Sequence, residues 1–216
     1  MESSCDLRYS RILQDKILAE QKTDTTDILE AMRIVDFVDG WLTENEGRLL
    51  FNLAKEATGV GVIVEIGSWK GKSTICLAKG SKAGKGSKVY AIDPHNGSDE
   101  IRKMQGEVNT LDEFRRNITL YNVEDIIIPL IKTSLDAAKN FDQRVELVFV
   151  DGAHDYDLVK LDFDLWFPKL NHGGIIAFHD TITWPGPKKV VEEFMHAGNR
   201  FRDILQIDSI TYGVKI

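Results

Sequence analysis

This sequence has few cysteines, no long hydrophobic run and no excess of positive charge, and each of these absences excludes a class of protein. The two cysteines, Cys5 and Cys76, are isolated and provide neither the spacing of a zinc motif nor a disulfide framework. No apolar run approaches the length of a membrane span, and the first residues lack the basic and apolar regions of a secretory signal. We therefore expect a protein of the reducing cytoplasm that makes no contact with a membrane.

The charge balance disfavours nucleic acid as a partner. The chain has 27 Lys and Arg residues against 34 Asp and Glu residues, which gives a formal net charge of −7. Lysines cluster between residues 70 and 88, but Gly80, Gly84 and Gly86 interrupt the run. We interpret this run as a solvated helix face and a turn, because a nucleic-acid surface needs a continuous basic stripe.

Alternating strand and helix patterns after residue 61 predict a parallel β-sheet with helices on both faces. The apolar runs expected to form strands are residues 62–66, 88–92, 126–131, 145–150, 174–178 and 203–216. The segments expected to form helices are residues 71–80, 110–120, 134–140, 155–168 and 187–197. The last apolar run contains two parts joined by Asp208 and Ser209 with no helix between them, which predicts a hairpin. We therefore predict a Rossmann-like, doubly wound α/β fold whose mostly parallel sheet has an antiparallel C-terminal strand.

Helical patterns precede the predicted sheet. Residues 1–60 contain apolar stripes at helical spacing, and residues 43–46 (Thr-Glu-Asn-Glu) form a capping box that opens one helix. A second capping box is predicted at residues 110–113 (Thr-Leu-Asp-Glu). We assign residues 1–42 to an N-terminal helical extension that acts as a lid or as the contact of a homodimer, and residues 43–216 to the main domain.

The turn after the first predicted strand has the pattern of a nucleotide-type ligand site. Residues 62–74 contain a strand, a glycine turn and a helix start. A dinucleotide fingerprint would need glycines at positions 67, 69 and 72, but Trp69 and Lys72 occupy two of them. A phosphate-binding P-loop needs four residues between its first glycine and the Gly-Lys-Ser that follows, and this loop has only three between Gly67 and Gly71. Glu65 would also repel a triphosphate.

S-adenosylmethionine has no phosphate, so the objections to a dinucleotide and to a triphosphate do not apply to it. The acid Glu65 near the turn suits its cationic methionine end, and Gly67 and Gly71 allow the backbone to lie against the ligand. Asp93, directly after the second predicted strand, is placed to accept hydrogen bonds from the two ribose hydroxyls. The alternative is a buried strand followed by an ordinary turn, which explains the glycines but not the paired acids.

A second group of polar residues follows the fourth and fifth predicted strands. Asp151, His179 and Asp180 stand at these strand ends, where ligands bind in a doubly wound sheet. Two carboxylates and one imidazole could bind a divalent cation such as Mg²⁺ or Mn²⁺. His154, three residues after Asp151, could act as a general base towards a substrate hydroxyl. The alternative is that Asp151 or Asp155 caps the following helix.

With these motifs, residues 43–216 resemble class I S-adenosylmethionine-dependent methyltransferases. They are most similar to small-molecule O-methyltransferases of the type that includes macrocin O-methyltransferase and catechol O-methyltransferase. Residues 64–73 match the family motif Glu-x-Gly-x-x-x-Gly-x-Ser, which binds the methionine moiety. Asp93 matches the ribose acid, and Ser134 falls where the family contacts adenine. The residues at which the resemblance implies a cofactor contact are Glu65, Gly67, Ser68, Trp69, Gly71, Ser73, Asp93 and Ser134.

The resemblance also implies roles in catalysis. Metal-dependent members have Asp-x-x-Lys or Asp-x-x-His after the fourth strand, and the segment from Asp151 to His154 is similar to the second form. There the Asp binds the metal and the third residue beyond it is the base. Those members have Glu-Asp or Asp-Asn after the fifth strand, whereas this chain has His179 and Asp180. If no metal binds, His179 is a second candidate base.

We therefore predict metal-assisted methyl transfer from S-adenosylmethionine to a hydroxyl of a small polar molecule such as a sugar, a phenol or a natural-product scaffold. Trp184 is a candidate for the acceptor pocket, and the polar residues 94–109 for a mobile loop over the site. The alternatives are a non-catalytic S-adenosylmethionine-binding protein and a P-loop-like phosphotransferase.

Overall fold

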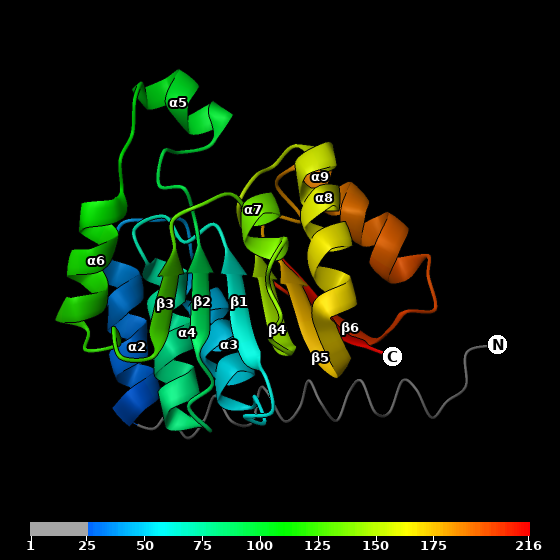
Figure 1. The fold of residues 1–216 in the computed structure, drawn as a ribbon, viewed down its shortest axis with the longest axis horizontal. Helices are drawn as coiled ribbons and strands as arrows, with labels where there is room; N and C mark the ends of the chain where they lie inside the picture. The colour runs from blue at the N-terminus through cyan, green and yellow to red at the C-terminus, as the bar shows by residue number, and fades with distance from the viewer. Residues whose placement is uncertain (1–25) are drawn as a thin grey trace.

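A mixed β-sheet of seven strands runs through the computed structural model, which describes residues 26–216 (Figure 1). The strands are β1 (Val62–Ile66), β2 (Val89–Ile92), β3 (Ile127–Leu130), β4 (Val145–Val150), β5 (Leu170–Phe178), β6 (Phe201–Ile207) and β7 (Ile210–Lys215). Their order in the sheet is β3-β2-β1-β4-β5-β7-β6, and β7 alone runs antiparallel to the other six strands. The predicted mixed sheet with its C-terminal hairpin is therefore confirmed.

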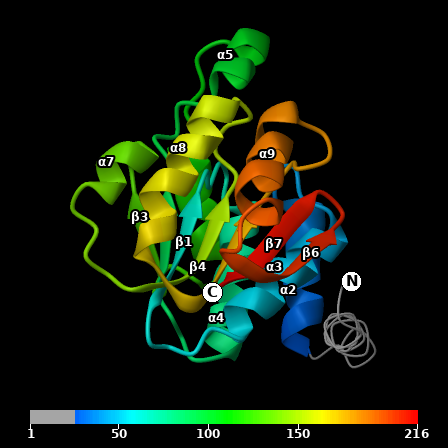
Figure 2. The same cartoon turned by 90° about the vertical axis from the view of Figure 1, so that its right-hand side faces the viewer.

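Helices cover both faces of the sheet (Figures 1 and 2). The α-helices are α2 (Thr26–Phe37), α3 (Glu44–Lys55), α4 (Lys72–Ala83), α5 (Asp99–Gln105), α6 (Leu111–Leu120), α7 (Ser134–Ala138), α8 (Tyr156–Trp166) and α9 (Pro185–Val190). A 3₁₀ turn, η1 (Phe167–Lys169), follows α8, and a π-helical segment, η2 (Val191–His196), follows α9. No described helix is long and apolar enough to cross a membrane.

Two apolar cores lie on opposite faces of the sheet because neighbouring strand residues point in opposite directions. Ile63 and Leu147 pack with residues of α2, α3, α4 and α6. Val64 and Val148 pack with residues of α7, α8 and α9. The strands are thus buried on both sides, which explains why they read as continuous apolar runs rather than alternating ones.

Local sequence signals explain most helix starts, but one prediction was wrong. The capping box at α3 is present, with the Thr43 hydroxyl accepting from the Glu46 N–H and the Glu46 carboxylate accepting from the Thr43 N–H. The capping box predicted at residue 110 does not form. The Thr110 hydroxyl instead lies 2.9 Å from Nδ1 of buried His95, so the imidazole takes the hydroxyl that would have capped α6.

The N-terminal region contributes to the core as far as it is described. Ile28, Met32 and Ile34 of α2 are buried with residues of α3 and α4. Residues 1–25, which include part of the predicted helical extension and Cys5, lie outside the described residues. The role of residues 1–42 as a lid or dimer contact stays a prediction. The segment predicted as a loop over the site contains α5, which projects beyond the carboxyl edge of the sheet (Figure 1).

The backbones of helices α3 and α4 are in direct contact at Gly80. A Cβ atom added at Gly80 in α4 would overlap the carbonyl oxygen of Phe51 in α3. The absence of a side chain at this position lets the two helices approach closely, and α4 follows the turn that opens the candidate ligand site. Gly80 therefore helps to fix where that turn lies.

We predict that Gly80→Ala destabilises the fold by about 1–3 kcal/mol, the usual cost of overpacking. Alanine normally stabilises a helix interior relative to glycine by up to about 1 kcal/mol. A lower stability of the Gly80→Ala variant would therefore come from the steric overlap. The measurement is the free energy of unfolding from urea denaturation. Gly198→Ala is the matched control, since its added Cβ would meet nothing closer than 3.5 Å. Equal stabilities of the two variants would contradict this account of the contact.

Candidate functional site

The turn after β1 touches the end of β4. Gly67 has a φ of 86°, in the left-handed region that favours glycine. A Cβ atom at Gly67 would overlap the carbonyl oxygen of Asp151. This close approach brings the two sequence motifs, the glycine turn and the strand-end acid, to one place at the carboxyl edge of the sheet.

Glu65 is fully buried and is bonded to the start of α4. The Ser73 hydroxyl donates to Oε1 at 2.5 Å, and the Thr74 hydroxyl donates to Oε2. Burial raises the pKa of Glu65 to about 8, against the opposing effect of the two hydroxyls. A carboxyl group with this pKa has little charge at neutral pH, which weakens the predicted attraction for a cationic ligand. Cofactor contacts of Glu65 and Ser73 stay predictions.

Asp93 accepts two backbone hydrogen bonds, one from the glycine turn and one from the segment that follows β2. Its carboxylate accepts from the N–H of Trp69 at 2.8 Å and from the N–H of His95 at 2.6 Å. Both donors are non-glycine residues with positive φ, 46° and 58°. Such conformations are uncommon and persist where the surroundings impose them, often at binding sites.

Two buried polar atoms of this turn have no hydrogen-bond partner within the described part of the chain. They are the Ser68 hydroxyl and Nε1 of Trp69. Buried polar groups are nearly always hydrogen-bonded, so each unpaired atom is costly unless a ligand or water satisfies it. These two atoms therefore fit a polar ligand seated against the turn between Gly67 and Gly71.

Ser134 begins α7 and turns its hydroxyl inwards. The hydroxyl accepts from Nε1 of Trp166 at 2.8 Å. It also interacts with buried Asp162, whose pKa burial raises to about 6 against the opposing hydrogen bond from Ser134. The side chain is thus committed to α8, and its predicted contact with adenine stays untested.

The three predicted metal ligands lie together. β4 and β5 are parallel neighbours with Val150 paired to Phe178, so the residues that follow these strands meet at the same edge. Nδ1 of His179 lies 3.0 Å from Oδ1 of Asp151 and 3.4 Å from Oδ2 of Asp180. One ligand atom from each residue falls within 4.8 Å of the others.

A buried carboxylate that the sequence analysis did not assign to the site completes this cluster. Oε2 of Glu46 lies 3.3 Å from Nε2 of His179, and the Glu46 and His179 side chains are 2% and 4% exposed. Sequence reasoning found Glu46 only as part of the α3 capping box. Nothing in the local pattern indicates its partner, because His179 is far away along the chain.

The cluster perturbs the pKa of each of its members. Burial alone would lower the pKa of His179, but Asp151, Asp180 and Glu46 outweigh it and raise that pKa strongly. Burial would raise the pKa of Glu46, but the adjacent His179 imidazole and the hydrogen bonds from Ser209 lower it to about 2. For Asp151, burial outweighs the nearby imidazole and raises the pKa. The three carboxylates thus favour the protonated form of the His179 imidazole.

His154 lies beside the cluster and stacks on an aromatic ring. Its Nε2 is 3.0 Å from Oδ2 of Asp180, and its ring is 4.2 Å from that of Trp184 at an interplanar angle of 9°. Buried Nδ1 of His154 has no hydrogen-bond partner among residues 26–216. Asp155 caps α8 by accepting from the N–H of Asp157, so neither Asp151 nor His154 is needed as the cap.

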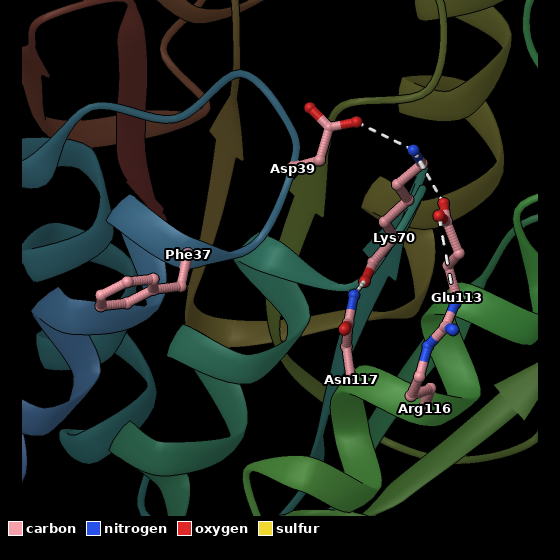
Figure 3. Close-up of a pocket in the computed structure, with 6 residues that line it drawn as sticks. All are labelled: Phe37, Asp39, Lys70, Glu113, Arg116 and Asn117. Atoms are coloured by element: carbon pink, nitrogen blue, oxygen red, sulfur yellow. Dashed lines mark hydrogen bonds and ion pairs between the residues drawn. The ribbon is translucent and has the colours of Figure 1, made fainter.

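A hollow of about 280 Å³ is lined by six residues, Phe37, Asp39, Lys70, Glu113, Arg116 and Asn117 (Figure 3). Its central cation, Lys70, pairs with Asp39 at 2.8 Å and with Glu113 at 2.7 Å. Asn117 donates to the Lys70 carbonyl oxygen. The charge of Lys70 is thus balanced by the two acids, and these contacts brace the turn against α6 and the segment after α2.

Comparisons with known proteins agree with this architecture. A family model described as a methyltransferase domain matches residues 64–181. The uncharacterized protein y4gI of Sinorhizobium fredii is 34% identical over 123 residues, which is 55% of this chain but only 13% of that protein. The chain thus matches a small part of the length of this curated relative.

Among solved structures, the O-methyltransferase NovP has a TM-score of 0.68 at 19% identity, covering 87% of this chain and 97% of that one. The O-methyltransferase TomG of Streptomyces achromogenes, solved with S-adenosylmethionine, has a TM-score of 0.62 at 17% identity, covering 100% and 99%. These likenesses establish the fold. Because the matching family model spans more than half of the sequence, the chain belongs to the methyltransferase-domain family.

Proposed function

We propose that this chain transfers a methyl group from S-adenosylmethionine to a hydroxyl of a small polar molecule, assisted by a divalent cation. The observation that supports this most is the contact between the Gly67 turn and the end of β4. It joins a turn with unpaired buried polar atoms to a cluster of carboxylates and an imidazole. The O-methyltransferases NovP and TomG, the latter solved with S-adenosylmethionine, have the same fold.

The turn would bind the cofactor. When bound, S-adenosylmethionine supplies an electrophilic methyl group on its sulfonium. Ser68 and Trp69 would satisfy their unpaired polar atoms on the methionine end, beside Gly67 and Gly71. Asp93 would bind the ribose hydroxyls with the carboxylate lone pairs that its two backbone bonds leave free.

The acidic cluster would orient the acceptor. Asp151, His179 and Asp180 fit a divalent cation because they offer two carboxylates and one imidazole nitrogen within 4.8 Å. When bound, such a cation supplies positive charge that lowers the pKa of an acceptor hydroxyl. His154 would take the hydroxyl proton, and Trp184, which is 39% exposed, would cover a face of the acceptor.

The rival functions receive less support. A phosphotransferase would direct the lysine of its loop at phosphate, but Nζ of Lys72 donates to the carbonyl oxygen of Gly40 at 2.7 Å. A protein that only binds the cofactor would not need Asp151, His154 and Asp180 beside the turn.

We predict that S-adenosylhomocysteine raises the melting temperature and that ATP and NAD do not. A ligand at a hundredfold excess over its dissociation constant stabilises the folded state by about 2.7 kcal/mol. Asp93→Asn should weaken this shift because it removes a charge that faces the ribose. Glu124→Gln, an exposed carboxylate before β3, is the control and should bind like the unaltered chain. Stabilisation by ATP alone would overturn the cofactor assignment.

We predict that exhaustive chelation abolishes methyl transfer and that Mg²⁺ or Mn²⁺ restores it. The measurement is S-adenosylhomocysteine formed with phenol, catechol and methyl glucoside as acceptor probes. Metal-free protein should still be stabilised by S-adenosylhomocysteine, because the turn and the cluster are separate groups of residues. Full turnover after chelation in metal-free buffer is the result that contradicts metal assistance.

We predict that His154→Ala lowers turnover by about 10²- to 10⁴-fold, the usual contribution of a general base. Affinity for S-adenosylhomocysteine should not change, and His172→Ala, an exposed histidine, is the matched control. Turnover is measured at saturating metal, because His154 also contacts Asp180. If saturating metal restores full turnover to the variant, His154 orients Asp180 and is not the base.

A further inference from the structure

We infer that Glu46 is a positioning residue of the metal site. Glu46 holds the His179 imidazole with Nδ1 towards Asp151 and Asp180, and this orientation makes the site favour Mn²⁺ or Fe²⁺ over Mg²⁺. This inference rests on the proposed function, because it concerns the cation at that site. It adds to the site a residue from α3, outside the strand ends that supply the ligands.

The two ring nitrogens of His179 face different partners. Nδ1 lies 3.0 Å from Asp151 and 3.4 Å from Asp180, on the side where a cation would bind. Nε2 lies 3.3 Å from Oε2 of Glu46, which is an ion-pair distance, and it makes no hydrogen bond within the described residues. A carboxylate at this distance stabilises a proton on Nε2, and the lone pair of Nδ1 is then the one available to a metal.

Metal-binding histidines usually donate their second ring N–H to a carboxylate or carbonyl group, and Glu46 places a carboxylate beside the corresponding nitrogen of His179. The acceptor fixes the ring orientation and increases the basicity of the ligating nitrogen. The His179 ring is also buried and has an edge contact with Phe149 at 6.1 Å between ring centres. Turning the ring over would move its nitrogens away from both groups of carboxylates.

Glu46 is itself held in place from two sides. Oε2 accepts from the Thr43 N–H at 2.9 Å, and Oε1 accepts from the N–H and the hydroxyl of Ser209 at 2.9 and 2.6 Å. Asp208 of the same hairpin turn accepts from the Thr43 hydroxyl at 2.6 Å. The start of α3 and the β6–β7 turn thus form a rigid support for a carboxylate aimed at the imidazole.

The identity of the ligands bears on the choice of cation. Carboxylates suit Mg²⁺ and Mn²⁺ alike, whereas an imidazole ligand suits transition metals and is a poor ligand for Mg²⁺. A site of two carboxylates and one imidazole therefore favours Mn²⁺ or Fe²⁺. This preference depends on Nδ1 facing the cation, which is the orientation that Glu46 supports.

The test is Mn²⁺ binding to the full chain, measured from the electron paramagnetic resonance of free Mn²⁺. Glu46→Gln should weaken Mn²⁺ binding by about 10- to 100-fold, the usual effect of removing such an acceptor. Glu44→Gln is the matched control in the same helix turn, since Glu44 is exposed and pairs with Arg48, and it should bind like the unaltered chain. Melting curves establish that each variant is folded.

A second variant keeps the test decisive if Glu46→Gln does not fold. The spin echo of Mn²⁺ bound to the unaltered chain should show ¹⁴N modulation from a coordinated imidazole, and His179→Asp should abolish it. His179→Asp should also shift the Mn²⁺-to-Mg²⁺ affinity ratio towards Mg²⁺ by about tenfold or more.

These measurements distinguish a failure of the proposed metal site from a failure of the role given to Glu46. If the unaltered chain binds no Mn²⁺, the metal of the proposed function and this inference both fail. If it binds Mn²⁺ with the ¹⁴N signature but Glu46→Gln binds equally well, this inference alone is overturned. Absence of ¹⁴N modulation in the unaltered chain also overturns it.

Discussion

The arrangement of the site depends on the burial of one imidazole among three carboxylates. His179 meets Asp151 from the neighbouring strand, Asp180 from its own segment and Glu46 from α3. Removing charges from water is costly, and the cost is offset only when partners with good geometry surround them. The contacts of His179 therefore tie together β4, β5, the start of α3 and, through Ser209, the β6–β7 hairpin.

The ligand turn is joined to this cluster through backbone rather than side chains. Gly67 lies against the Asp151 carbonyl group, so the turn cannot move without displacing the end of β4. Asp93 fixes the same turn from β2 by accepting the Trp69 N–H. The cofactor and the acceptor would thus be held in a fixed relation by the rigid sheet, which is the alignment that methyl transfer to an oxygen requires.

The sequence predicted the fold, and it also predicted that the strand-end residues of the candidate site would meet, because both follow from local patterns. Strand-end residues such as Asp151 and Asp180 meet wherever parallel strands are neighbours, so their proximity could be expected. Glu46 could not be found in this way, since its role depends on a contact across the fold. The same limit applies to Thr110, whose hydroxyl bonds to His95 rather than capping α6 as the local pattern indicated.

A crystal structure of the chain grown with S-adenosylhomocysteine and Mn²⁺, with anomalous diffraction recorded at the manganese edge, tests the proposed site most directly. We expect S-adenosylhomocysteine to lie against the turn between Gly67 and Gly71, with its ribose at Asp93. We expect one manganese peak bonded to Asp151, Asp180 and Nδ1 of His179, with Nε2 of His179 still facing Glu46. Manganese elsewhere, or S-adenosylhomocysteine away from this turn, would contradict the proposed site.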